Sequence, residues 1–365
     1  MIKEAQSYIE VVKKHYIFDD WQGMELLLAT VAAHFIPGQM FWVRLIGGSG
    51  TGKSDFLDSI AEGGKTKEPE NSHTIDADYW TAGSMRGGYS RKVDKGEKAS
   101  PRLVEEWNGK LVVTRDLAAI ITKKQEEKGE VFGLIRNAWD GKIDAYYGSD
   151  EGHVTLRFHF DWIAGVTSVI ESQRKFEATL GTRFVDLRWL LPQDEQGAIL
   201  AAMNNEPEMK AIKEELTQAM REFILAASSR QPRNIKPTSW TADMVRYAAN
   251  WRTPISRGQS GEVYELPDRE LGTRFGQGIW RMVKGLDMIG ITNYKPYVKR
   301  LALDSLGNAR RAVVKAHLID SKPTMEQIAE VAGSKAAMST LTTARHDLEL
   351  LGCNREALNR FEEVN

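Results

Sequence analysis

The chain has 365 residues and a formal net charge of −1, from 49 Lys and Arg against 50 Asp and Glu. This length is too great for one ordinary core and suits two or three domains. The balanced charge excludes a global field that draws the whole molecule to nucleic acid, so any basic surface must be local. The single cysteine, Cys353, excludes an internal disulfide, and no Cys/His cluster has the spacing of a zinc site, so we expect a reducing, cytoplasmic compartment.

The first elements are predicted to be two helices, because apolar residues recur at helical spacing over 4–16 and 21–35. The amino terminus is too charged for a signal peptide, and no apolar run is long enough to span a bilayer, so we expect a soluble protein with no membrane partner. Buried strands are predicted at 40–46, 110–114 and 160–166, where short apolar runs occur. Strands that alternate with helices favour an α/β fold with a parallel sheet.

The character of the sequence changes after Pro192. Helical periodicity continues over 194–227, 238–251 and 268–290 without a convincing strand, which is the pattern of a helical lid. Three short helical stretches within 309–358 then suit a helix-turn-helix or winged helix. We therefore divide the chain into N-terminal helices, an α/β core, a helical lid and a winged-helix-like domain, with the bounds 1–38, 39–192, 193–305 and 306–365.

Two segments within the α/β core are predicted to be insertions. Glycine and lysine are frequent over 62–100, which indicates a long functional loop, and residues 89–98 are its most basic part. Residues 142–153 have the character of a hairpin. Lysines in such loops can contact nucleic-acid phosphates, and a solvated charged loop is the alternative.

One motif carries a specific chemical prediction. Residues 47–54 fit the pattern G-x-x-x-x-G-K-[ST] and lie between a predicted strand and a predicted helix, as a phosphate loop requires. Its glycines let backbone N–H groups turn towards phosphate oxygens at the positive end of the following helix. Lys53 would contact the β- and γ-phosphates and Ser54 would hold Mg²⁺, so ATP and Mg²⁺ are the expected cofactors. The residues expected at the nucleotide are Gly47, Gly48, Ser49, Gly50, Thr51, Gly52, Lys53, Ser54 and Asp55.

A carboxylate that binds the metal or activates water should follow a neighbouring strand, and Asp116 is the candidate. Two adjacent acids usually share these tasks, one at Mg²⁺ and one at the water. Here Arg115 stands beside Asp116 instead. Whether Asp116 is the metal ligand or the general base therefore stays open, and hydrolysis could be slow.

Together with these motifs, the order of the remaining pieces resembles AAA+ ATPases, and within them the MCM-like branch of phage and mobile-element replication proteins. The resemblance covers about residues 20–354. It implies that Thr167, after the third strand, is the sensor near the γ-phosphate, where MCM proteins tend to have Asn. Residues 180–187, LGTRFVDL, are similar to the stretch that supplies an arginine finger, so Arg183 would enter a neighbour's site, with a surface ion pair as the alternative.

The resemblance also assigns residues in the helical parts. The stretch 270–275, ELGTRF, is similar to the sensor 2 helix, which implies a γ-phosphate contact by Arg274, with packing of its stem as the alternative. Residues 323–351 resemble the winged helix that follows such motors, and its contact with DNA or with protein stays open. Its outward residues would be Lys335, Thr340, Thr343 and Arg345, and its inward residues Leu341, Leu348 and Leu351.

The function implied by the resemblance is an ATP-driven AAA+ motor that translocates on or unwinds DNA. Self-association into a ring, with a hexamer expected, would complete its sites, and other replication proteins would be further partners. The alternative is a loader or nucleotide-controlled switch that binds a replication protein and hydrolyses ATP slowly. A phosphoryl-transfer kinase is a third hypothesis, and it would need no arginine finger.

Overall fold

The computed structural model of the chain describes residues 1–86, 103–122, 125–146, 153–173, 183–258, 260–265, 271–333 and 336–362. The strands are β1 (Trp42–Ile46), β2 (Thr74–Asp76), β3 (Leu111–Thr114), β4 (Lys142–Tyr146), β5 (His153–Arg157), β6 (Asp161–Val166), β7 (Phe184–Arg188), β8 (Ser256–Arg257) and β9 (Val263–Glu265). The first seven helices are α1 (Lys3–His15), α2 (Trp21–His34), α3 (Lys53–Gly63), α4 (Ala82–Arg86), α5 (Leu103–Trp107), α6 (Ala118–Ile121) and α7 (Gln125–Trp139). The later helices are α9 (Glu195–Asn205), α10 (Met209–Ser228), α11 (Ser239–Trp251), α12 (Thr273–Met288), α13 (Lys295–Asp304), α14 (Asn308–Ile319), α15 (Met325–Ala332), α16 (Met338–Leu350) and α17 (Arg355–Glu362). Short 3-10 turns lie at η1 (Pro69–Asn71), η2 (Ser168–Gln173) and η3 (Glu206–Glu208).

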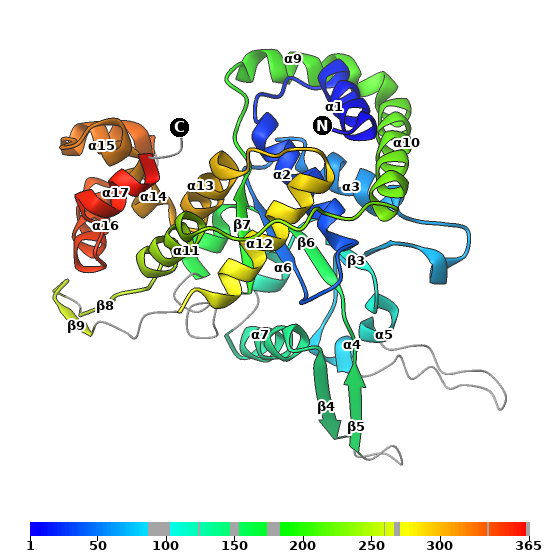
Figure 1. Ribbon diagram of the computed structural model, residues 1–365, viewed down its shortest axis with the longest axis horizontal. Helices are drawn as coiled ribbons and strands as arrows, with labels where there is room; N and C mark the ends of the chain where they lie inside the picture. Colours follow the sequence, from blue (N-terminus) through cyan, green and yellow to red (C-terminus); the bar gives the residue numbers. More distant parts are fainter. Residues whose placement is uncertain are drawn as a thin grey trace.

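A five-stranded parallel sheet in the order β2-β3-β6-β1-β7 organises the chain (Figure 1). All four neighbouring pairs in this sheet run parallel. The prediction of a parallel α/β sheet is thus confirmed, as are its three expected strands, which are β1, β3 and β6. No helix in the described part of the chain has the length and apolar character needed to cross a membrane.

Alternate residues of the central strands face two separate hydrophobic cores. On one side Val43 and Leu45 pack with α1, α2, α3 and the helices from α10 to α14. On the other side Trp42 and Ile46 pack in a tryptophan-rich core with α5, α6, α7 and the hairpin β4–β5. A sheet buried on both faces explains why its strands appear in the sequence as continuous apolar runs.

The expectation for 62–100 is corrected in part. Residues 62–86 are not a free insertion, because they contain β2, the edge strand of the sheet, and helix α4. Residues 89–98 lie outside the described residues. The predicted hairpin is confirmed, since β4 and β5 pair antiparallel and project from the end of the molecule (Figure 1).

The helical regions differ from the expectation in their breaks. The helix expected over 194–227 is two helices, α9 and α10, because Pro207 interrupts it in a 3-10 turn. Helix α12 begins only at Thr273 and packs along α2, so it lies against the sheet's helical layer.

The C-terminal part consists of helices α14 to α17. Leu341, Leu348 and Leu351 are buried and Thr340 and Thr343 are exposed, as predicted. Among the residues described up to 362, a helix and not a strand follows α16, so the expected wing does not follow it. A hairpin from upstream, β8–β9, lies beside α16 instead, where Arg257 pairs with Asp347. Lys335 lies outside the described residues, and Arg345 pairs with Glu349 at 3.4 Å.

Arg44 and Asp186 form a buried ion pair between β1 and β7. Their side chains approach to 2.7 Å and are 1% and 3% exposed. We expect Asp186→Ala to lower the free energy of unfolding by about 3–5 kcal/mol, because it leaves a buried guanidinium without this carboxylate. Urea unfolding followed by circular dichroism measures the loss. Glu10→Ala, which breaks the exposed pair with Lys13, is the control, with an expected loss under about 1 kcal/mol. Equal losses in the two variants would contradict the prediction.

Candidate nucleotide site

The glycine-rich segment 47–54, Asp116 and Thr167 all lie at the carboxyl edge of the sheet. They follow β1, β3 and β6, which are adjacent parallel strands. The chain after β1 covers one face of the sheet with α3, and the chain after β6 covers the other face with η2. Ligands of open α/β sheets bind outside the carboxyl ends of strands at such a switch of direction. The structure therefore brings three of the predicted site positions together.

The backbone of the 47–54 loop takes conformations that need glycine. Gly50 and Gly52 have φ values of 76° and 75°, in the left-handed region. Gly47 donates its N–H to the Val166 carbonyl at 3.0 Å and packs so tightly that a Cβ there would lie 2.8 Å from Cβ of Trp189. Helix α3 begins at Lys53, directly after the second left-handed glycine. The exposed N–H groups of this turn and the start of the helix form the setting in which proteins hold phosphate.

Lys53 is folded back onto its own loop. Its Nζ donates to the carbonyl oxygens of Gly47, at 2.7 Å, and of Gly48, and to Oγ1 of Thr51 at 3.3 Å. Burial lowers the pKa of the Lys53 ammonium, and the negative charge of Asp116 opposes that shift. A buried cation, 8% exposed and held mainly by neutral carbonyls, is suited to an anionic ligand, so these residues fit a nucleotide phosphate.

Asp116 is exposed beside this lysine. Its Oδ1 accepts a hydrogen bond from the Ala118 N–H at 2.8 Å, and the Leu117 N–H donates to the Gly165 carbonyl at 2.8 Å, which ties the segment after β3 to β6. One carboxylate oxygen thus orients the side chain, which leaves the other for a metal ion or its water. Thr167 is half-buried at the end of β6.

The side chain of Arg115 is held by carboxylates of neighbouring elements. It forms ion pairs with Asp78, after β2, and with Asp58 of α3 at 2.8 Å. The hydrogen bond to Asp78, and to a lesser extent the one to Asp58, raise the pKa of the Arg115 guanidinium further above its usual range. The residue beside Asp116 therefore holds α3 to the edge of the sheet, and no local sequence pattern indicates this role.

Residues outside the motif fix the loop from the other side. Trp189, after β7, donates Nε1–H to the Thr51 carbonyl at 3.2 Å. Tyr16 donates its hydroxyl to Asp55 at 3.1 Å, and Lys213 of α10 pairs with Asp55 at 2.9 Å. Asp55 was expected among the nucleotide-binding residues, and its carboxylate is turned to these two partners, while Ser54 is exposed.

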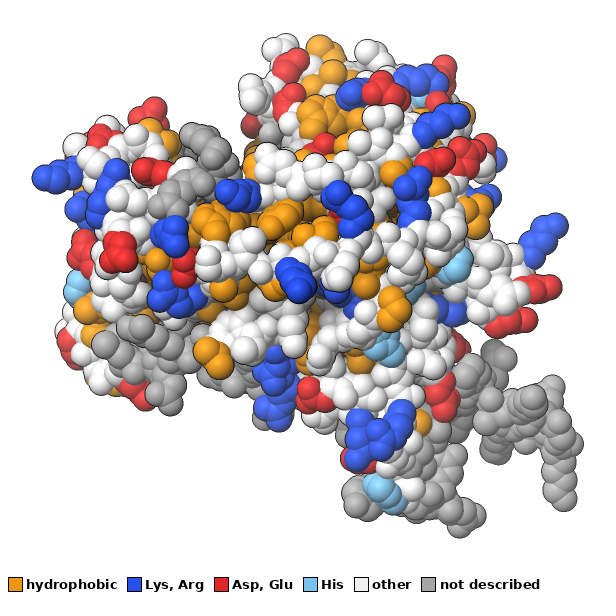
Figure 2. Space-filling view, in the orientation of Figure 1, with side chains coloured by type: hydrophobic (Ala, Val, Ile, Leu, Met, Phe, Trp, Pro, Cys, Tyr) orange, Lys and Arg blue, Asp and Glu red, His pale blue; other side chains and the backbone are white. Residues whose placement is uncertain are grey.

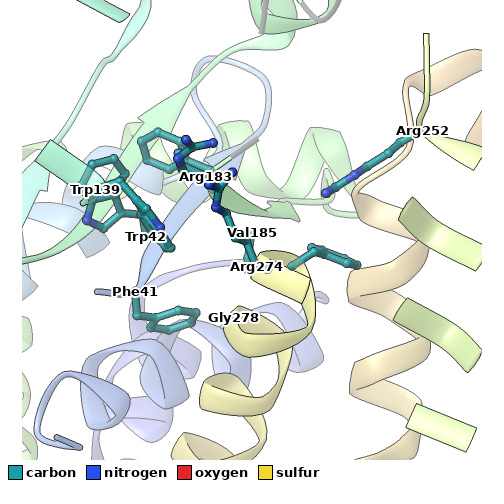
Figure 3. A pocket seen from close by; sticks show the side chains of 10 residues that line it. Phe41, Trp42, Trp139, Arg183, Val185, Arg252, Arg274 and Gly278 are labelled. Atoms are coloured by element: carbon teal, nitrogen blue, oxygen red, sulfur yellow. The ribbon is translucent and has the colours of Figure 1, made fainter. Parts of the chain in front are cut away.

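Arg183 and Arg274 lie at the opposite edge of the sheet. Arg183 precedes β7, whose five residues separate it from the loop's edge by about 16 Å at about 3.3 Å per residue. Arg274 is exposed in the first turn of α12, and both residues line a small pocket with Phe41 and Trp42 (Figure 3). Neither arginine is near the loop of its own chain, so the lid contact expected for Arg274 is not made within one subunit.

Arg252 joins this pocket from α11 and was not singled out in the sequence. Its guanidinium lies 4.5 Å from the ring centre of Phe275, and its side chain extends towards the pocket that Arg183 and Arg274 line (Figure 3). An arginine at a helix end carries no local sequence signal of this kind, because the pocket is formed by segments far apart in the chain.

Comparison with models of protein families found no match, and comparison with curated proteins found no relative. In the described part of the chain, no group of three or more His, Cys, Asp or Glu side chains is placed to hold a metal ion.

Proposed function

We propose that this protein is an ATP-dependent oligomeric AAA+ motor that acts on DNA as a helicase or translocase. One observation carries the proposal. The lysine of the 47–54 loop, the Asp116 carboxylate and Thr167 meet at one edge of the sheet, while Arg183 and Arg274 lie at the other. Such an arrangement divides the groups needed for ATP hydrolysis between the two ends of one subunit.

The division of groups supports sites that two subunits share. We call the edge of the sheet that carries Arg183 and Arg274 the arginine edge, and the edge that carries residues 47–54 the loop edge. If the arginine edge of one copy faces the loop edge of the next, Arg183 can neutralise charge on the transferred phosphoryl group. An interface between two different surfaces of identical chains is heterologous, and it closes into a ring when the rotation permits. The expected hexameric ring is one such closure.

The roles within the site follow from chemistry. Bound ATP supplies the phosphoanhydride bond, and Mg²⁺ neutralises its charge and orients its phosphates. Lys53 would bind the phosphates in place of its present carbonyl partners, and Ser54 and Asp116 would provide oxygens for the metal or its water. Thr167, at the end of β6, would orient the attacking water or the γ-phosphate.

The hairpin β4–β5 is the surface that best supports DNA contact. Lys142 and Arg157 are directly opposite each other in its register. Like charges at such positions are destabilising, so their presence favours a role in binding an anion. Both side chains are exposed, although Asp144 pairs with Lys142 at 2.7 Å. Figure 2 shows Lys and Arg side chains on this projecting hairpin, away from the main body.

The proposal is tested by steady-state ATP hydrolysis over a range of protein concentrations, with and without single-stranded DNA. We expect specific activity to rise with protein concentration and with DNA. The variant Lys142→Ala/Arg157→Ala should lose the DNA stimulation. The slope of log Kd for DNA against log salt concentration should fall by about 1 to 2, because two phosphate contacts are removed. Arg230→Ala, at an exposed position on another surface, is the control. Activity independent of both concentration and DNA would refute the motor.

A nucleotide-controlled switch is the second candidate, and Arg115 favours it. Its ion pairs with Asp58 and Asp78 occupy the position at which a second catalytic acid is usual. Such a protein would bind ATP and change its assembly while hydrolysing it slowly. Oligomers that form on ATP binding but turn over only a few ATP molecules per hour, with or without DNA, would select the switch.

A further inference from the structure

Helix α9 presents an apolar face that the described part of the chain does not cover. Ile199, Leu200 and Met203 are 61%, 52% and 68% exposed, and α9 has no buried residue. Ile199 and Met203 are four residues apart and therefore lie on the same side of the helix. Three large exposed apolar side chains on a helix of 11 residues indicate a surface that binds another molecule.

Helix α9 lies beside the candidate nucleotide site. The segment leading into it carries Leu191, whose Cδ2 would lie 3.9 Å from a Cβ on Gly48, and the Gln193 N–H donates to Asp19. At its other end Asn205 donates to the His15 carbonyl at 2.6 Å, next to the tyrosine that contacts Asp55. Figure 1 shows α9 at the same end of the molecule as α1.

A groove of about 1000 Å³ lies at the opposite edge, between α11, α12 and residues 36–40. Its walls are largely apolar and include Met40, Val245 and Trp280. The first turns of α12 border it on one side and carry Arg274 on the other, so the groove and the arginine pocket are neighbours. Figure 2 shows hydrophobic side chains in the hollowed centre of this face, over α12 and its neighbours.

The charges of the two surfaces are complementary. Residues 189–209, which include α9, contain four acids, Asp194, Glu195, Glu206 and Glu208, and no Lys or Arg. The groove is lined by Arg246, Arg281 and Lys284 and by no acid. Buried Asp161 compensates Arg281, and exposed Arg246 pairs with half-buried Asp243. Lys284 is therefore the groove cation expected to attract the acids of α9.

We propose that α9 of one copy docks into the α11–α12 groove of the next copy. This inference rests on the proposed function, because it assumes that the arginine edge of one subunit faces the loop edge of another. The groove adjoins the pocket of Arg183 and Arg274, and α9 adjoins the 47–54 loop. An arrangement that places Arg183 at a neighbour's loop therefore also places the groove at that neighbour's α9. The apolar face supplies the contact and the acids set its orientation, as for an amphipathic helix in a groove.

The test uses full-length variants blocked on one surface only. Ile199→Glu/Met203→Glu blocks α9, and Ala242→Glu/Gln277→Glu adds acid to the groove; Ala242 and Gln277 are exposed, so the core is untouched. In sedimentation velocity with Mg-ATP, each variant alone should associate about tenfold or more weakly than the unmodified chain. An equimolar mixture should form dimers and nothing larger, because only one pair of intact surfaces remains. Ile319→Glu, at a 79% exposed site on α14, should assemble normally.

Three results would overturn the docking. They are assembly of either blocked variant as well as the Ile319→Glu control, a mixture that stays monomeric, and an unmodified chain that is monomeric at every concentration, which would refute the oligomeric motor as well. Binding of a fluorescent ATP analogue to each variant is measured separately. An unmodified chain that does not bind ATP would refute the proposed function. An unmodified chain that binds ATP and assembles, with variants that do not mix as expected, would refute only the docking.

Discussion

Lys53→Ala should lower ATP turnover by at least about a hundredfold, because it removes an ammonium group directed at the loop where phosphate is expected. In the absence of nucleotide this group is held by the carbonyls of Gly47 and Gly48, which are neutral acceptors. The side chain is thus already positioned at the cradle and needs only to exchange partners when an anion binds. We expect the loss to include ATP affinity as well as turnover.

The measurement is steady-state hydrolysis together with titration of a fluorescent ATP analogue. Lys53→Arg tests whether charge alone suffices, since a guanidinium is planar and larger than an ammonium and should not recover activity. Lys13→Ala, which removes an exposed lysine paired with Glu10, is the matched control and should behave as the unmodified chain. Undiminished ATP affinity and turnover in Lys53→Ala would refute the nucleotide site at residues 47–54.

The elements of the core could be predicted where local sequence determines them. Strands β1, β3 and β6 are short runs of large apolar residues, because both faces of the sheet are buried. The edge strand β2 was missed, since its three residues, Thr74 to Asp76, form no apolar run and a strand that short depends on pairing with β3. Pro207 indicates the break between α9 and α10, but the apolar periodicity continues across it and predicts one helix.

The candidate site was predictable only in part for a similar reason. The motif at 47–54 and Asp116 each follow a strand, so a parallel sheet is enough to bring them together. The position of Arg274 depends on how α12 packs along α2, which no local pattern determines. The contribution of Arg252 and the bonds of Arg115 to Asp58 and Asp78 likewise depend on segments that meet only in the folded chain.

The position of Arg183 leads to the second large effect. Because this residue lies at the far edge of the sheet from its own loop, Arg183→Ala should leave ATP binding to the monomer unchanged. It should nevertheless lower turnover by about a thousandfold, the low end of what an arginine finger contributes. Arg230→Ala, on an exposed surface, provides the control.

Mixing two inactive variants then distinguishes a shared site from a site within one chain. Arg183→Ala keeps an intact loop, and Lys53→Ala keeps an intact arginine. In an equimolar mixture, the subunit that supplies the loop has Lys53 in about half of the interfaces, and the subunit that supplies the arginine has Arg183 in about half. About one quarter of the interfaces therefore contain both groups. We expect turnover to reappear on mixing, to a level set by that fraction. Because neither chain alone contains a complete site, recovered activity can arise only across an interface, and a mixture as inactive as its two components would place the function of Arg183 outside a neighbour's site.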